Sequence, residues 1–432
     1  MTILSKQIIS NSAWMIFEKI ISMFGLIFVM SFVAKYIGPS NFGKITLATT
    51  IFTFVQTLTW FGNQEILFKR VSKNQKSGLI YLYGTQNIRR IIFTFLSIPI
   101  LCWLYFFSDF LTLIFGVATA LASYFLVQDI FVVYNNAVLN SYINAIVNII
   151  GLVVALLTRY IIVWFELDIV YLSIPIVLVT LVPFLMKNYC FNVDQKRICE
   201  ESRDKIKIKK YIKYYMGAGS SLVVSNLSIA LYTQITSLFL VWKTSTYELG
   251  LYSVAVALGM SWGFVNQAII TSVLSKIYKE KNDYLAYEMV AKLNFLIIVI
   301  ASFVILLLIF LGKWVVNLLY GQAYLSAYPL LIIMALAATS SGLGTISARL
   351  IIREEGYSYI SKKMLFVAIS SLPISYLCIH WFGLLGAAYS VFLIEFLSFS
   401  FFNYFYKKGL IFKIHLFPFY KNDLKKRSLE TM

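Results

Sequence analysis

Long apolar stretches, each about the length of a membrane-spanning helix, recur through this whole chain. A helix needs about 20 predominantly apolar residues to cross the hydrocarbon core of a bilayer. Such stretches lie at residues 12–34, 42–61, 90–107, 110–131, 143–164, 169–189, 215–242, 250–273, 293–311, 324–346, 364–382 and 384–405. The sequence therefore predicts an all-α integral membrane protein with twelve transmembrane helices.

The composition leads to the same class. The chain has 432 residues, of which 60% are hydrophobic and only 13% are charged. Globular domains have about 25% charged residues, which they need to cover their surface. This excludes most soluble enzymes, disordered scaffolds and free nucleic-acid binders. A single basic residue, Lys6, precedes the first apolar run, and no small-residue cleavage pattern follows it, so we expect a retained span rather than a signal peptide.

The surplus of positive charge is distributed unevenly between the loops on the two predicted sides of the membrane. The chain has 37 lysines and arginines against 19 acidic residues, a formal net charge of +18. Counted by loop, nearly all the cations fall on the side of the two termini, and the opposite loops hold only Lys35, Lys44, Lys243 and Lys313. Cytoplasmic loops are enriched in lysine and arginine, so both termini are predicted to be cytoplasmic. Nucleic acid is not needed as a partner to explain the charge.

The spans are expected to form two pseudo-symmetric six-helix bundles. The longest charged stretch, 187–213, separates the sixth span from the seventh, and residues 37–48 resemble residues 244–255, with Gly43 opposite Gly250. We predict an N-terminal bundle at 1–190, a basic cytoplasmic linker at 191–213, a C-terminal bundle at 214–406 and a basic cytoplasmic tail at 407–432. An even number of spans gives both bundles the same orientation, as in transporters built of parallel repeats.

Four motifs, in order, resemble one branch of a transporter superfamily. They are GPSNFG (38–43), after an opening span that begins NSAW (11–14), then YTQITSLFL (232–240), ELGLYSVA (248–255) and YGQAYLSAYPLLII (320–333). Together they resemble the polysaccharide-flippase branch of the multidrug/oligosaccharidyl-lipid/polysaccharide exporter superfamily, whose usual count is twelve spans. That branch often has an acidic residue two places after the Gln of the seventh span, whereas here Gln234 is followed by Ile235 and Thr236.

The resemblance implies a function. Such flippases, which are not enzymes, move a lipid-linked oligosaccharide, typically on undecaprenyl diphosphate, from the inner to the outer leaflet of the bacterial plasma membrane. The O-antigen repeat unit is the commonest cargo, and membrane lipids and other glycan-assembly proteins are the implied partners. Two alternatives remain. An ion-coupled drug or small-cation exporter shares the fold, although cations at Lys19 and Arg159 argue against it. A membrane glycan polymerase or ligase usually needs a large outer loop, which this chain lacks.

A flippase needs a polar path, because taking a sugar-diphosphate headgroup into hydrocarbon is very costly. The fifth span places Asn144, Asn148 and Arg159 on one helical face. The planar guanidinium of Arg159 suits a diphosphate, since it can donate two parallel hydrogen bonds. Alternatively, Arg159 snorkels to the outer interface near Glu166 and Asp168.

Other candidates for the substrate cavity lie in three further spans. Glu18 and Lys19 in the first span either contact substrate or pair with a neighbouring helix. Arg349, at the inner end of the tenth span, either captures the headgroup or anchors the helix at the cytoplasmic surface. Ser221 and Ser225 in the seventh span line the cavity or simply allow close helix packing.

Two carboxyl groups are candidates for ion coupling. Glu395 lies near the middle of the twelfth span, where a carboxylate needs a partner or a proton, and Asp129 lies near the inner end of the fourth. The alternatives are a neutral, hydrogen-bonded Glu395 and an Asp129 that faces the cytoplasm. The chain has no nucleotide-binding motif, so an ion gradient or substrate flux must supply the energy. With isolated His380 and His415 and no metal-like cysteine spacing, no metal or other cofactor is predicted.

Overall fold

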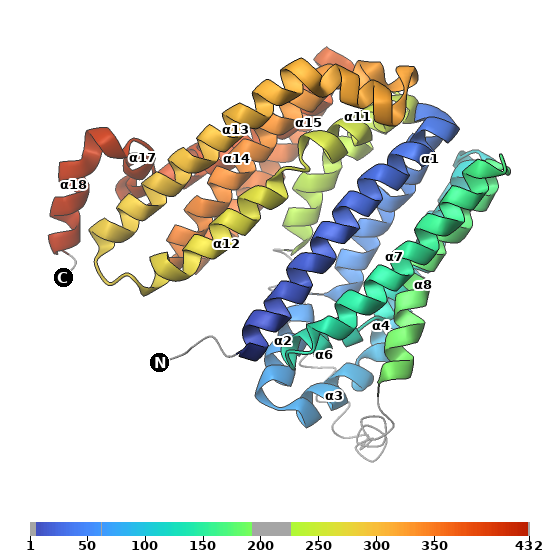
Figure 1. Cartoon of the computed structure of the whole chain (residues 1–432), viewed down its shortest axis with the longest axis horizontal. Helices are drawn as coiled ribbons and strands as arrows, with labels where there is room; N and C mark the ends of the chain where they lie inside the picture. Colours follow the sequence, from blue (N-terminus) through green and yellow to red (C-terminus); the bar gives the residue numbers. More distant parts are fainter. Residues whose placement is uncertain (1–5, 62, 192–225, 431–432) are drawn as a thin grey trace. The chain divides into compact units, whose positions relative to one another are not determined.

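The computed structural model describes residues 6–61, 63–191 and 226–430 (Figure 1). Within these ranges the chain is helical and contains no β-strand. It divides into two compact units, unit 1 from Met1 to Ala230 and unit 2 from Leu231 to Met432. The predicted linker 191–213 lies outside the described residues, apart from Phe191.

Unit 1 is built around four long helices that pack against one another. Its elements are α1 (Lys6–Trp60), α2 (Asn63–Lys73), α3 (Gln75–Gly84), α4 (Gln86–Phe107), α5 (Phe110–Gln128), α6 (Phe131–Ala137), α7 (Ser141–Trp164), the 3₁₀ turn η1 (Ile169–Leu172) and α8 (Ser173–Cys190). Helix α7 packs against both α1 and α8, and α5 packs against the same two helices. The polar residues on these four helices can therefore meet inside the bundle.

Unit 2 is organised around α14. Its elements are the helix over 226–243 from Leu231 onward, α11 (Thr246–Gly259), α12 (Gly263–Lys279), α13 (Asp283–Tyr320), η2 (Gln322–Ala327), α14 (Tyr328–Arg353), α15 (Tyr357–Phe399), α16 (Phe401–Tyr404), η3 (Tyr406–Lys408), α17 (Leu410–His415) and α18 (Phe417–Glu430). Helix α14 packs against α11, α12, α13 and α15. Small residues such as Ala335, Ala338 and Gly342 are buried along it, which lets these neighbours approach closely.

Two of the longest helices each contain a glycine with a positive φ angle. Gly38 in α1 has φ 74° and Gly383 in α15 has φ 54°, far from the helical value of about −63°. A residue with a Cβ atom resists this conformation, whereas glycine adopts it readily. Each glycine therefore divides its helix into two arms, and these arms coincide with the predicted pairs of spans, 12–34 with 42–61 and 364–382 with 384–405.

Eight helical stretches of the described chain are long and apolar enough to cross a membrane, judged by length and composition. They are Gln75–Phe107, Phe110–Ala137, Ser141–Trp164, Ile169–Cys190, Thr246–Tyr278, Asp283–Tyr320, Gln322–Arg353 and Tyr357–Tyr404. The all-α membrane fold class is thereby confirmed. The count of twelve spans stays a prediction.

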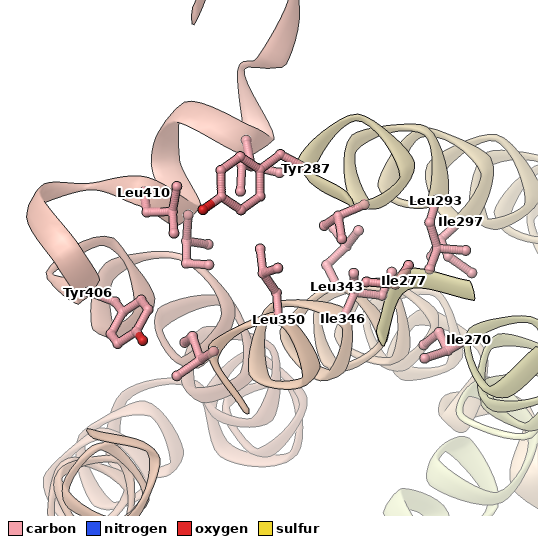
Figure 2. Packing of buried hydrophobic residues seen from close by; sticks show 14 residues of the cluster. Ile270, Ile277, Tyr287, Leu293, Ile297, Leu343, Ile346, Leu350, Tyr406 and Leu410 are labelled. Carbon is pink, nitrogen blue, oxygen red and sulfur yellow. The ribbon is translucent and has the colours of Figure 1, made fainter. Parts of the chain in front are cut away.

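The C-terminal tail is part of the core of unit 2. Figure 2 shows the cluster in which Leu410 from α17 and Tyr406 from η3 approach Tyr287 of α13 and Leu350 of α14. Ile411 and Ile414 are also fully buried in this cluster. The tail then continues into α18, which packs beside α13 and α17 (Figure 1). The basic tail thus folds back onto its own bundle through its apolar residues.

Candidate functional site

A continuous chain of hydrogen-bonded polar groups runs through the interior of unit 1. The Lys187 ammonium on α8 lies 2.7 Å from the Asp129 carboxylate, just after α5, and donates a 2.7 Å hydrogen bond to the Asn148 amide oxygen on α7. The Asn148 amide nitrogen in turn donates to a carboxylate oxygen of Glu18 on α1, at 2.5 Å. We call these four residues the unit 1 charge chain. The structure thus brings together Glu18, Asn148 and Asp129, which the sequence singled out on three separate spans.

The charges of this chain do not cancel. A buried ammonium needs a carboxylate beside it, and Asp129 supplies one to Lys187. When all of its groups are ionised, however, the unit 1 charge chain has two carboxylates and one ammonium. The surplus negative charge lies on helices that the fold places inside a membrane, where an unbalanced charge is costly. The arrangement can therefore take up one proton or one monovalent cation without losing the Lys187–Asp129 ion pair.

Asn144 lies one helical turn before Asn148 and joins α7 to α6. Its amide nitrogen donates to the carbonyl oxygen of Val132 at 3.0 Å and to the side-chain oxygen of Asn136 at 2.9 Å. Its amide oxygen accepts a hydrogen bond from Asn135 at 2.9 Å. Both donor positions of the amide are therefore used within unit 1. A contact between Asn144 and substrate stays a prediction.

Arg159 lies on the same helix, about 16 Å further along its axis than Asn148. The residue is only 7% exposed, and its Nη1 atom has no hydrogen-bond partner among the described residues. It forms no ion pair with a described carboxylate, and Asp168 instead accepts a hydrogen bond from the backbone N–H of Val170. A buried guanidinium with an unused donor is costly unless an anion joins it. Arg159 can therefore donate a hydrogen bond to an oxygen of an anionic group.

Glu395 is part of a second cluster, in unit 2. Its carboxyl group, on the second arm of α15, interacts with the Ser341 hydroxyl on α14 and with the Lys363 ammonium on the first arm of α15. The phenol of Tyr232, on helix 226–243, lies close enough to Glu395 to be affected by the charge of its carboxylate. Lys363 is itself buried. Each unit therefore contains a carboxyl group that interacts with a buried lysine, through a 2.7 Å ion pair for Asp129 and Lys187 and at longer range for Glu395 and Lys363.

Three cations counted as loop residues from the sequence are in fact buried inside helices. Arg89, Lys187 and Lys363 are 1%, 2% and 6% exposed. Arg89 and Lys363 directly precede the apolar runs 90–107 and 364–382, and Lys187 lies near the end of the run 169–189, so hydropathy alone does not separate them from loop cations. Arg89 is held differently from the two lysines: it donates to the Thr85 hydroxyl at 2.8 Å, and its guanidinium lies over the Trp60 ring at 5.6 Å. The placement of the remaining loop cations on the side of the termini stays a prediction.

Of the remaining predicted site residues, the structure describes the side chain of Arg349, which does not join these clusters. Arg349 is exposed near the end of α14, where its backbone carbonyl accepts a 3.2 Å hydrogen bond from the Tyr278 hydroxyl. The side chain of Lys19, and residues Ser221 and Ser225, lie outside the described part of the chain. Their assignment to a substrate cavity stays a prediction.

A cluster of hydroxyl groups lies where the resembling branch often has an acid. The Thr236 hydroxyl is buried 3.0 Å from the Ser375 hydroxyl and 3.3 Å from that of Ser390. Each hydroxyl can both donate and accept, so the three groups can satisfy one another without a charge. This position of unit 2 therefore joins helix 226–243 to both arms of α15 through neutral groups.

Comparison of the sequence with known protein families identifies a match over more than half of the chain. Residues 8–275 match the family described as "Polysaccharide biosynthesis protein". Among curated proteins, the capsular polysaccharide biosynthesis protein CapF of Staphylococcus aureus is 28% identical over 165 residues. This alignment covers 38% of the present chain and 42% of CapF, so the chain matches less than half of that relative's length.

Solved structures show the same fold. Lipid II flippase MurJ in an inward closed conformation has a TM-score of 0.69 at 16% identity, covering 96% of this chain and 93% of MurJ. An inward-facing multidrug resistance MATE family transporter of the MOP superfamily has a TM-score of 0.60 at 12% identity, covering 93% and 96%. The chain therefore shares the fold of these membrane proteins. With the match over residues 8–275, the chain belongs to the polysaccharide biosynthesis protein family.

Proposed function

We propose that this protein moves an oligosaccharide linked to undecaprenyl diphosphate from the inner to the outer leaflet of the bacterial plasma membrane. The cargo is an O-antigen repeat unit, and both termini of the protein are cytoplasmic. The observation that carries the proposal is the family match over residues 8–275. The likeness in fold to a lipid II flippase, which covers nearly the whole chain, supports it.

In this proposal Arg159 receives the diphosphate. A guanidinium donates paired hydrogen bonds to phosphate oxygens, and the unused Nη1 donor of Arg159 leaves one of these positions free. The N-terminal bundle at 1–190 and the C-terminal bundle at 214–406 alternate between inward- and outward-open arrangements, while the lipid tail stays in the bilayer. Lys19, Arg349, Ser221 and Ser225 complete the polar path.

Asp129 and Glu395 are the proposed coupling groups. Each interacts with a buried lysine, Asp129 with Lys187 and Glu395 with Lys363. Protonation of either carboxyl group removes the negative charge that attracts its lysine, and release of the proton restores it. A proton gradient can therefore change the contacts inside each unit during the transport cycle.

A deletion strain tests the proposal directly. We expect such a strain to lose its surface glycan and to accumulate the lipid-linked oligosaccharide on the cytoplasmic side of the membrane, and the intact gene to reverse both effects. Normal glycan display without such accumulation would refute the function. The resistance profile of the strain tests the drug-exporter alternative, for which sensitivity to drugs would rise while glycan display stayed normal.

A capsular repeat unit is the second candidate cargo, favoured by the 28% identity to CapF over 165 residues. The same deletion strain distinguishes the two candidate cargoes. Chemical analysis of the cell surface would find capsule missing and lipopolysaccharide complete if the capsular unit is the cargo. The opposite loss would support the O-antigen unit.

A further inference from the structure

A groove of about 360 Å³ opens on the surface of unit 2, where the start of α15 faces α16. Its walls are formed by Tyr359, Lys362, Lys363, Phe366, Phe401, Phe402 and Phe405. Five of these seven residues are aromatic, so the walls of the groove are mainly apolar. Apart from the two lysines, no charged residue lines it.

The groove is held in shape by its own contacts. The Tyr359 hydroxyl donates to the backbone carbonyl of Phe402 at 2.6 Å, which ties the first turn of α15 to α16. The Phe401 ring meets the Phe405 ring edge-on, with centroids 4.9 Å apart. Phe366, Phe401 and Phe405 nevertheless leave more than half of their surface exposed. An exposed apolar groove with fixed walls suits an apolar chain that enters from the bilayer.

The two lysines give the groove a charged end. Lys362 is exposed and Lys363 is buried, with its ammonium close enough to interact with the Glu395 carboxyl group. A long lysine stem can form part of an apolar wall while its ammonium lies at the polar edge. The occupant that matches these walls is therefore an apolar chain that ends in a negatively charged group.

We propose that this groove binds the carrier lipid of the substrate before its diphosphate reaches Arg159, with the first isoprene units against Phe366, Phe401 and Phe405 and the diphosphate at Lys362. This inference rests on the proposed function. A diphosphate joined to a sugar has two negative charges, which match the two lysines, whereas an ordinary phosphodiester lipid has one. A phosphate that draws Lys363 toward the groove also weakens its contact with Glu395. Substrate binding at the groove is thereby linked to a proposed coupling group.

Photolabelling tests the groove. The full-length protein in lipid nanodiscs is mixed with a polyprenyl diphosphate that carries a diazirine near its diphosphate, irradiated and digested for mass spectrometry. We expect label on residues 359–366 and 401–405. Lys362→Gln should reduce this label about tenfold, which corresponds to about 1.4 kcal/mol, and Lys362→Arg should retain it. Lys313→Gln, which removes another exposed lysine of unit 2, is the matched control and should change nothing.

Three results would overturn the inference: no label on these segments, equal label in Lys362→Gln, or equal competition by phosphatidylglycerol and by unlabelled polyprenyl diphosphate. The third would mean that the groove holds ordinary anionic phospholipid. A separate transport assay keeps the two proposals apart. If the protein transports the lipid-linked oligosaccharide but the groove is not labelled, only this inference is refuted. A specifically labelled groove in a protein that leaves glycan display unaffected supports the lipid site and refutes the proposed function.

Discussion

Removal of the Lys187 ammonium should destabilise unit 1 strongly. The Lys187 and Asp129 side chains are 1% and 6% exposed, and their charged atoms lie 2.7 Å apart. Breaking a buried ion pair by removing one partner typically costs about 3–5 kcal/mol, because the other charge stays buried alone. Lys187→Met also takes away a hydrogen bond to the Asn148 amide oxygen. We therefore expect Lys187→Met to lower the free energy of unfolding of unit 1 by about 3–5 kcal/mol.

A double-mutant cycle isolates the pair. In the variant with both Lys187→Met and Asp129→Asn, neither member of the ion pair is left as a buried charge, so the combined loss should be about 2–3 kcal/mol smaller than the sum of the single losses. Hydrogen exchange of the α7 and α8 amides in the detergent-solubilised protein measures the local stability of unit 1. Lys69→Met, at an exposed lysine of α2, is the matched control and should stay within about 0.5 kcal/mol of the wild type.

Two results would refute this reasoning. The first is a loss of less than about 1 kcal/mol in Lys187→Met, which would mean that water or another group replaces the ammonium at little cost. The second is a double variant as unstable as the sum of its single variants, which would mean that the two charges do not depend on each other.

Three further predictions concern transport and the tail. Arg159→Ala should reduce surface glycan at least about tenfold while membrane insertion stays normal, since charge-assisted hydrogen bonds are the strong ones; glycan blots of cells with only this variant measure it, and wild-type display would contradict the assigned role. Glu395→Gln should abolish the dependence of transport on an imposed pH gradient, and unchanged dependence would exclude proton coupling through Glu395. Burial lowers the pKa of His415, whose ring lies 3.2 Å from the hydroxyls of Ser347 and Tyr404, to about 4. The folded state therefore favours the neutral ring, so stability is fully present above pH ~6.5 and is lost, by up to about 3 kcal/mol, as the pH falls toward ~4. Protease cleavage of the tail should rise over that window in the wild type and stay flat in His415→Gln, and a pH-independent wild-type rate would contradict the argument.

Hydropathy alone is sufficient to predict the long helices. The apolar run at 110–131 matches α5 (Phe110–Gln128) and the run at 143–164 matches α7 (Ser141–Trp164), because each is long enough to satisfy its backbone hydrogen bonds within one helix. The short elements were not predicted. Helix α6 (Phe131–Ala137) and helix α17 (Leu410–His415) are too short to be stable alone and exist because they pack onto neighbours.

The sequence singled out three of the four residues of the unit 1 charge chain, but not their pairings. Glu18, Asn148 and Asp129 stood out as polar groups inside apolar spans. Which of them would meet could not be read from one sequence, because Asn148 lies 130 residues from Glu18, and Lys187 lies 58 from Asp129. Lys187 was missed for a second reason. A lysine beside the end of an apolar run has the same local pattern whether it faces water or a buried carboxylate.

The packing of the C-terminal tail also defines where the folded part of unit 2 ends. Leu410, Ile411 and Ile414 follow the last apolar span, yet they complete the core of unit 2. Full burial of such a side chain is worth about 1.5–3 kcal/mol. A protein shortened to its last span would therefore lose much of its marginal stability and expose an apolar face on α13 and α14. The smallest stable form of unit 2 extends at least to His415, and a fluorescent reporter or purification tag belongs beyond α18.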